Sequence, residues 1–165
     1  HRHPWGAWFL GWTPRQQDGF PLRRIGGNLY FPDAPIVPNR PDGRMTAPTA
    51  RNIQEITLYA ILPSGAYRYD AKANRLAQVS SENLTQSVTG KAPLTVVYVA
   101  DTKKQPNLKM SAVDCGFIGQ NIYLYCASAG LSTVIRGSFD KGFISKLNLP
   151  EGSEVFFIQS VGFPK

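Results

Sequence analysis

Residues 114–137 have the sequence DCGFIGQNIYLYCASAGLSTVIRG, and this stretch decides how the chain folds. We expect the longest helix to begin at Asp114, or at a residue just before it. It should end at Gly130, because glycine readily adopts the left-handed conformation that closes a helix. A short strand over 131–135 follows and leads into Gly137. Helices and strands therefore alternate along the chain, which predicts a fold of mixed class with crossover connections.

Apolar side chains surround most of the predicted helix. Along its middle only Gln120, Asn121 and Ser128 offer polar contacts. A helix that is apolar nearly all round is buried, either in a large core or between subunits. Because the chain has only 165 residues, we favour a homodimer interface over a monomer core.

Outside this stretch the sequence predicts five more strands and two short helices. The strands are rich in apolar and β-branched residues, and turn residues such as Pro63-Ser64-Gly65 end them. The strands are expected over 54–62, 66–69, 75–79, 94–100 and 155–161, and the helices from a Ser80 or Ser81 cap through Gln86 and from an Asp140 cap through Leu147.

The composition excludes several classes of enzyme. The net charge is +7, and no run of about 18 apolar residues is long enough to form a transmembrane helix. The only histidines are His1 and His3, so a catalytic triad or a Cys–His pair would need the extreme N-terminus in its site. Two cysteines and two terminal histidines also lack the ligand spacing of a metal site.

The two cysteines are not expected to pair. Cys115 and Cys126 lie eleven residues apart on the predicted helix, which separates them by about 16 Å. A disulfide needs Cα atoms within roughly 7 Å of each other. We expect both to be small buried side chains, and they leave the redox compartment open.

Residues 1–38 differ in composition from the rest of the chain. Three tryptophans lie among glycines in the first twelve residues, and prolines recur every third residue from 32 to 41. We expect this segment to lie on the surface of its own chain or of a partner, with a membrane-surface arm and a nucleic-acid stacking arm as alternatives. The expected organisation is an atypical Pro/Gly/Trp-rich segment over 1–38, followed by one domain over 39–165.

Three segments carry groups that could bind a ligand. The loop over 39–52 collects arginines that could grip a phosphate, and Thr49 and Asn52 could bond to a ring edge. An ordinary polar loop is the alternative. The strand that ends at Gly137 could bring backbone N–H groups close to a flat ligand, because glycine has no Cβ, although a simple strand end has the same sequence pattern. The third segment is the C-terminal run over 159–165.

Together, these segments resemble the nitroreductase family, and most closely the branch that includes thiazole- and oxazole-forming dehydrogenases. The resemblance covers residues 39–165 in order and without a large gap. It rests on NRPDGR at 39–44, TAPTARN at 46–52, YRYD at 67–70, the stretch over 114–137 and VGFP at 161–164.

The resemblance implies a homodimeric α+β fold, with a nitroreductase-like mixed sheet flanked by helices and one FMN in each of two interface sites. In this family a hydride passes from NAD(P)H to flavin N5 and on to a small-molecule acceptor such as a nitroaromatic, a quinone or an azoline. The flavin carries that chemistry, so no catalytic side chain is expected.

The resemblance also implies a set of cofactor-binding residues. The family's Pro-Ser-Ser/Ala-x-Asn stretch contacts the flavin held mainly by the other subunit, and two backbone N–H groups bond to flavin N5 and O4. Fixed donors at these atoms stabilise negative charge on a reduced flavin. The matching residues are Pro48, Thr49, Ala50 and Asn52 for the stretch, Arg136 and Gly137 for the backbone donors, and Lys165 as a cation for the phosphate.

The sequence departs from the family before Asn39. The family begins with a helix whose Arg-Arg-Ser-x-Arg pattern holds the FMN phosphate, whereas Arg23-Arg24 is followed here by Ile-Gly-Gly. We therefore expect the N-terminal helices to be missing or replaced, through a reading-frame change, a rearrangement or a truncation. The loss of two or three charge-assisted hydrogen bonds, at about 1.5–3 kcal/mol each, would weaken FMN binding by several orders of magnitude unless other cations replace them.

Two other functions compete with an FMN oxidoreductase. One is a non-catalytic dimeric remnant that binds flavin weakly or not at all. The other is a basic nucleic-acid-binding module, but the cations are spread along the chain without a recognisable motif, so we expect no nucleic-acid or membrane partner. The sequence does not specify the electron acceptor or the choice between NADH and NADPH. A bacterial cytoplasmic location is expected, with the periplasm as the alternative.

Overall fold

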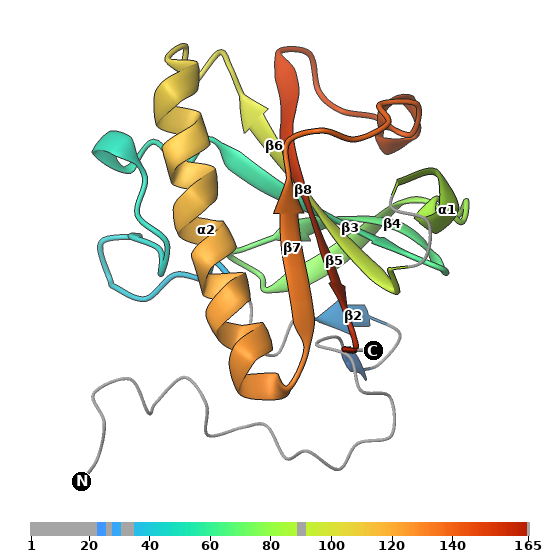
Figure 1. Ribbon diagram of the computed structural model, residues 1–165. Coiled ribbons are helices and arrows are strands. Elements are labelled where there is room, and N and C mark those ends of the chain that lie inside the picture. Colours follow the sequence, from blue (N-terminus) through green and yellow to red (C-terminus); the bar gives the residue numbers. More distant parts are fainter. Residues whose placement is uncertain (1–22, 26–27, 31–34, 89–91, 165) are drawn as a thin grey trace, which may run out of the picture.

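The computed structural model describes residues 23–25, 28–30, 35–88 and 92–164. These residues form one sheet in the strand order β1-β2-β5-β4-β3-β6-β8-β7, and the long helix α2 crosses one of its faces (Figure 1). The expected α+β class is confirmed. The strands are β1 (Arg23–Ile25), β2 (Asn28–Tyr30), β3 (Ile56–Leu62), β4 (Gly65–Asp70), β5 (Arg75–Ser80), β6 (Leu94–Asp101), β7 (Ser132–Arg136) and β8 (Ser153–Gly162); the helices are α1 (Thr85–Val88) and α2 (Leu108–Ala129), with short 3-10 turns η2 (Ala50–Asn52) and η3 (Ile144–Leu147).

The strands predicted over 54–62, 66–69 and 75–79 form β3, β4 and β5, which pair as two successive antiparallel hairpins. Gly65 opens β4 with φ of +136°, and a Cβ there would lie 2.3 Å from the carbonyl oxygen of Ser80. No other residue fits this turn without a backbone shift. In the next turn the side chain of Asp70 accepts the N–H groups of Lys72 and Ala73, as turn-forming aspartates commonly do.

The second half of the sheet contains the expected crossover. Helix α2 connects β6 to β7, and β8 then returns between these two strands. All pairings between described strands are antiparallel. The expectation of a mixed sheet is therefore corrected: β6 and β7 run in the same direction, but β8 separates them.

Helix α2 begins six residues before Asp114, and this corrects the predicted start. The side chain of Asn107 caps the helix by accepting the N–H of Lys109 at 3.1 Å. Its C-terminal end agrees with the prediction, because Gly130 adopts the left-handed conformation with φ of 68°. Asp114 is a buried residue within the helix.

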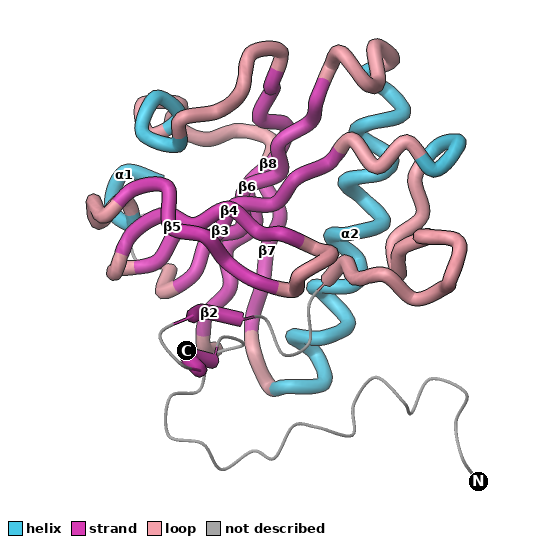
Figure 2. The backbone as a smooth tube through the Cα atoms, turned by 180° about the vertical axis from the view of Figure 1, so that it is seen from behind, coloured by secondary structure: helices cyan, strands magenta, loops and turns pink. Residues whose placement is uncertain are grey.

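Both faces of the sheet are covered by apolar side chains, because residues alternate sides along each strand. Leu58 and Tyr98 belong to the cluster on the side of α2, whereas Ile61 and Val97 belong to the cluster under α1 and η3. Figure 2 shows α1 and α2 on different sides of the strands. The burial of all seven residues from Leu94 to Ala100 confirms the prediction that this strand is covered on both faces.

The two short helices differ from their predictions. Helix α1 begins at Thr85, and Asn83 rather than Ser80 or Ser81 accepts the N–H of Thr85. Ser80 is instead the last residue of β5, so it cannot start a helix. Over 140–147, Asp140 caps only a turn by accepting the N–H of Gly142, and the regular part is the 3-10 turn η3.

The described residues before β3 form no α-helix. Strands β1 and β2 pair with each other, and Leu29 of β2 pairs with Leu76 of β5, so part of the compositionally atypical segment extends the main sheet. The three N-terminal tryptophans lie outside the described residues, as do Pro32 and the residues that flank it. Within the described residues no helix is long and apolar enough to span a membrane.

Candidate functional site

The loop over 48–52 has an unusual backbone. Its residues 50–52 form the 3-10 turn η2, within which Arg51 has φ of 54°. Asn52 and Gln54 also have positive φ angles, 58° and 55°. Left-handed conformations of non-glycine residues cost of order 1–3 kcal/mol each, and they persist only where the surroundings hold them. This loop therefore needs strong anchors.

Side chains of the loop itself provide one set of anchors. The hydroxyl of Thr49 accepts the N–H of Gln54 at 2.9 Å. The side-chain amide of Gln54 donates to the carbonyl of Gly43 at 2.9 Å and to the side-chain oxygen of Asn52 at 2.8 Å. Gln54 thus ties both edges of the loop together, a role that the sequence analysis missed.

Helix α2 provides the other anchor. The N–H of Ala50 donates to Oδ2 of Asp114 at 3.1 Å, across 64 residues of sequence. Asp114 is 2% exposed, and the nearby Glu55 is 1% exposed. Burial raises the pKa of Glu55, and the neighbouring Asp114 carboxyl raises it further, against the opposing effects of backbone and Ser111 hydrogen-bond donors. A buried acidic pair therefore lies behind the loop.

The strand β7 carries the second expected group of residues. It is an edge strand of the described sheet, and Ile135 donates its N–H to the hydroxyl of Tyr123 at 3.0 Å rather than to β8. Successive N–H groups of a strand point to opposite sides. This alternation directs the N–H of Arg136 toward its partner Ile158 on β8. Gly137 follows directly after the last residue of the strand.

Within one chain these two groups of residues do not meet. In Figure 1 the turn η2 (teal) and β7 (orange) lie to either side of α2. Between them, α2 exposes the large apolar side chains Met110, Val113, Phe117 and Leu124. The spacing of these four residues along the helix, three, four and seven positions, places them in one stripe on the face opposite the buried side. We call them the α2 stripe.

Both cysteines are buried and unpaired, as predicted. Burial raises the pKa of Cys115 to about 12, with contributions from Glu55 and Asp114, and that of Cys126 to about 11. Thiols with such pKa values are poor nucleophiles. Among the described residues no cluster of three or more His, Cys, Asp or Glu side chains is arranged to hold a metal ion.

The comparison with protein families decides the identity of this fold. The model of the nitroreductase family matches residues 33–163, which is most of the chain. The chain belongs to the nitroreductase family. This confirms the resemblance that the sequence analysis drew from the ordered motifs.

Several solved structures have a similar fold. A putative nitroreductase from Ralstonia eutropha JMP134 is 32% identical, with a TM-score of 0.72, over 79% of this chain and 69% of that chain. The Escherichia coli microcin synthetase McbBCD complex is 17% identical, with a TM-score of 0.70, over 79% and 60% of the two chains. The NADPH:FMN oxidoreductase of Vibrio harveyi, complexed with NAD+, is 23% identical with a TM-score of 0.50, over 73% and 55%. No curated protein matches this sequence.

In this nitroreductase family member, the end of β7 is where the edge of a flavin is expected to lie. We expect the alternation along β7 to continue at Gly137 and to direct its N–H at the free edge of the sheet. A Cβ at that glycine would lie 3.5 Å from the ring of Phe157. The unprotonated N5 and the O4 carbonyl of an oxidised flavin accept hydrogen bonds and would match such a donor. The expected phosphate cation, Lys165, lies outside the described residues, and nothing is described of the side chains of Arg23 and Arg24.

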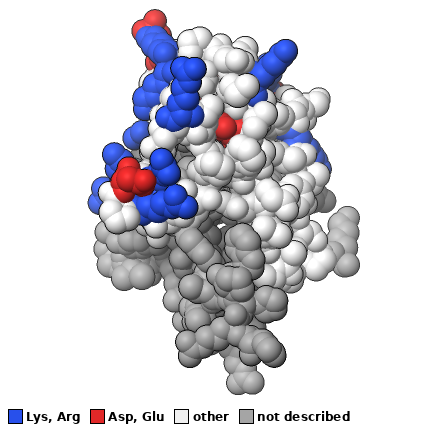
Figure 3. All heavy atoms as spheres, turned by 90° about the vertical axis from the view of Figure 1, so that its left-hand side faces the viewer, with Lys and Arg blue, Asp and Glu red and all other residues white. Residues whose placement is uncertain are grey.

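Cations are prominent on the side of the molecule that carries α2 and the loop over 35–55 (Figure 3). Two cations on this side form ion pairs with acidic side chains. Arg44 pairs with Asp42 at 3.3 Å, and Lys103, in the turn after β6, pairs with Glu151 at 3.0 Å. These surface pairs contribute little to stability. The exposed cations of the loop, of the turn after β6 and of the start of α2 are Arg40, Arg44, Arg51, Lys103, Lys104 and Lys109.

Proposed function

We propose that the protein is an FMN-dependent oxidoreductase that takes its electrons from NAD(P)H. The observation that carries this proposal is a pair of structural groups in a nitroreductase family member. These are the anchored loop over 48–52 and the exposed end of the edge strand β7 at Gly137. The sequence resemblance implies that both kinds of group touch the flavin, one from each subunit.

The proposed active form is a homodimer in which α2 packs against α2 of the partner. Two features support it. The α2 stripe leaves four large apolar side chains 41–56% exposed, a pattern that marks interaction surfaces more often than free ones. The two halves of the site lie on either side of that stripe, so a second copy would bring its own loop toward the β7 end of the first.

In this arrangement each residue has a defined task. Gly137 presents its N–H to the acceptor edge of the ring, and Tyr123 holds the preceding part of β7 by accepting the N–H of Ile135. Pro48, Thr49, Ala50 and Asn52 line the ring from the partner subunit. Lys165, with Arg23 or Arg24, is proposed to neutralise the phosphate.

When bound, FMN supplies the hydride-transfer chemistry between a nicotinamide donor and a nitroaromatic, quinone or similar acceptor. The chain's own contribution is to orient the ring and to keep donors fixed where negative charge accumulates. The absence of any histidine among the described residues is compatible with this division of labour.

A non-catalytic dimeric remnant is the second candidate. The observation in its favour is that the described residues before β3 form strands and a 3-10 turn, and that Arg23-Arg24 is followed by Ile-Gly-Gly instead of the family's Ser-x-Arg. Such a remnant would keep the sheet and the α2 stripe but bind FMN weakly or not at all.

A matched pair of variants tests the proposal. Gly137→Ala keeps the backbone N–H and places a methyl group in ordinary contact with Phe157, whereas Gly137→Pro removes the N–H. We expect wild type and Gly137→Ala to bind FMN and to be reduced by NADH or NADPH. Gly137→Pro should bind FMN at least about tenfold more weakly.

Two results would contradict the proposal. A wild-type protein that takes up no added FMN would favour the remnant. Equal FMN binding by Gly137→Pro and Gly137→Ala would show that the edge of β7 does not hold the ring.

A further inference from the structure

The arginines of the loop over 39–52 have no task in the proposed function. Their sequence pattern indicates phosphate binding, but the FMN phosphate is assigned to other residues. Arg40 and Arg51 are exposed, and neither forms an ion pair with a described acid. An exposed guanidinium without a partner is a strong donor to phosphate, because its planar fork offers parallel N–H groups. These two side chains are therefore available to an anionic ligand.

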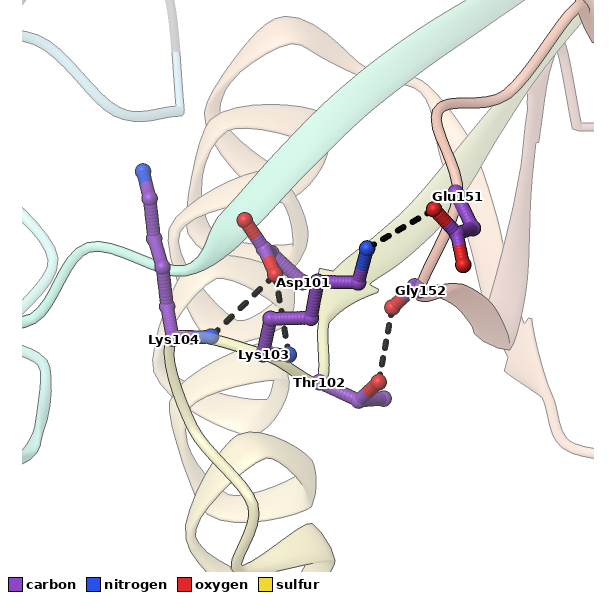
Figure 4. Close-up of polar contacts among 6 residues, drawn as sticks. All are labelled: Asp101, Thr102, Lys103, Lys104, Glu151 and Gly152. Carbon is purple, nitrogen blue, oxygen red and sulfur yellow. Dashed lines mark hydrogen bonds and ion pairs between the residues drawn. The ribbon is translucent and has the colours of Figure 1, made fainter.

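Two lysines of adjoining segments are also unpaired. Lys104 lies in the turn after β6 and Lys109 in the first turn of α2, both exposed and without an ion pair among the described residues. In Figure 4 Lys103 pairs with Glu151, whereas Lys104 points away from that pair. The helix dipole disfavours a cation at Lys109, and the first turn of α2 holds no acid to offset it. The four unpaired cations form what we call the cation group: Arg40, Arg51, Lys104 and Lys109.

Hydrogen bonds between these segments keep the cation group on one side of the molecule. The N–H of Ala50 donates to Asp114 of α2 at 3.1 Å, and the N–H of Asp101 donates to the carbonyl of Glu55 at 3.0 Å. The side chain of Gln54 joins the two edges of the loop. The loop, the turn after β6 and the start of α2 are therefore neighbours, and Figure 3 shows cations gathered on this side.

The described acids of the same segments form no ion pair with the cation group. Asp42 pairs with Arg44 at 3.3 Å, and the side chain of Asp101 accepts two backbone N–H groups (Figure 4). Glu55 and Asp114 are buried behind the loop. A ligand that approaches from solvent therefore meets unpaired positive charge.

We propose that the cation group binds the 2′-phosphate of NADPH and thereby makes NADPH, rather than NADH, the electron donor. The two nucleotides differ only in this phosphate, which carries about two negative charges at neutral pH. In other nucleotide-binding folds an arginine commonly accommodates the same group. Here Arg40 and Arg51 supply planar donors, and Lys104 and Lys109 supply positive charge.

The proposal rests on the proposed function, because it places the cation group beside a flavin. In the proposed dimer the loop over 48–52 lines the ring that the partner subunit holds, and Arg51 belongs to that loop. A nicotinamide stacked on the ring leaves the adenosine end of the nucleotide away from flavin N5. The surface beyond the loop carries Arg40 and the two lysines, so that end would meet positive charge.

Two double variants with the same change in net charge test the proposal. Arg40→Gln with Lys104→Gln removes two members of the cation group and leaves the loop over 48–52 intact. Arg68→Gln with Lys146→Gln is the control. Arg68 is exposed on β4 opposite Tyr59, and Lys146 is exposed on η3, so both lie on the face of the sheet away from α2.

Two measurements are made, and one does not require FMN. The first compares the calorimetric affinities of 2′,5′-ADP and 5′-AMP, which differ by the 2′-phosphate. The second compares kcat/KM for NADPH and NADH with a quinone acceptor. We expect wild type and the control to prefer the 2′-phosphorylated compound by at least about tenfold in both measurements. The Arg40/Lys104 variant should lose most of this preference through a higher KM for NADPH, with NADH unchanged within about threefold. Added salt should weaken NADPH more than NADH, because it screens exposed charges.

The outcomes distinguish this proposal from the proposed function. If the protein binds 2′,5′-ADP selectively but takes up no FMN, the flavin site fails while the cation group keeps its phosphate. If wild type uses NADH and NADPH equally, or if the control loses the same preference, the cation group does not bind the 2′-phosphate. A short oligonucleotide that binds more tightly than 2′,5′-ADP, and only with the cation group intact, would assign this surface to nucleic acid instead.

Discussion

Replacing Phe117 by lysine should dissociate the proposed homodimer. Phe117 lies in the α2 stripe and is 44% exposed. A phenylalanine offers about 200 Å² of surface, so roughly 90 Å² would be buried by a partner. At about 25 cal/mol per Å² this gives about 2 kcal/mol per chain and about 4 kcal/mol for a symmetric dimer. The dimer dissociation constant should therefore rise about a thousandfold, before any cost of burying the new charge.

The assay is sedimentation equilibrium across protein concentrations, with Leu108→Lys as the control. Leu108 also lies on α2 and is also 44% exposed. It precedes Phe117 by nine residues, which is two and a half helical turns. It therefore projects from the opposite side of the helix. A Phe117→Lys protein that stays dimeric, or a Leu108→Lys protein that dissociates equally, would refute the assignment of the interface to the α2 stripe.

Three further predictions concern the fold itself. Cys115 and Cys126 should not react with a thiol reagent at pH 8 until the protein unfolds, since burial raises their pKa values to about 12 and about 11. Rapid labelling of the native protein would contradict the burial of these two thiols. The raised pKa of Glu55 means that the folded state keeps a proton that the unfolded state releases near pH 4.5. Its contribution to stability is thus complete below that pH and is lost as pH rises through the folded pKa, and urea unfolding should show this decline in wild type but not in Glu55→Gln. Gly65→Ala should destabilise the protein by more than about 2 kcal/mol in thermal unfolding, because the new Cβ would meet the carbonyl of Ser80 at 2.3 Å; an unchanged melting temperature would contradict the turn geometry.

Local signals explain which parts of the fold the sequence could predict. Gly130 and the turn at 63–65 mark element ends by backbone chemistry alone, and the structure places both as expected. The start of α2 was missed because Asp114 has the residue type of a cap, whereas the true cap is Asn107. Only the burial of Asp114 against Ala50 shows that it belongs to the helix interior.

The candidate site was predictable only in part. The motifs pointed to the loop over 48–52 and to the end of β7. The residues that anchor these two segments are Gln54 and Asp114 for the loop and Tyr123 for β7. They act through tertiary contacts that no local sequence pattern encodes. Glu55 was missed for the opposite reason, since an acidic residue at the start of a predicted strand is normally exposed. The left-handed turn at Arg51 has no glycine to signal it.

The most direct test of the central claim is FMN binding by the assembled protein. Titration of the wild-type chain with FMN, followed by the shift of flavin absorbance and by sedimentation at a flavin wavelength, gives both stoichiometry and assembly state. We expect one flavin per chain, carried by a dimer. Two results would contradict this expectation. One is that no flavin absorbance sediments with the protein at about 100 μM free FMN, and the other is that the flavin sediments with a monomer.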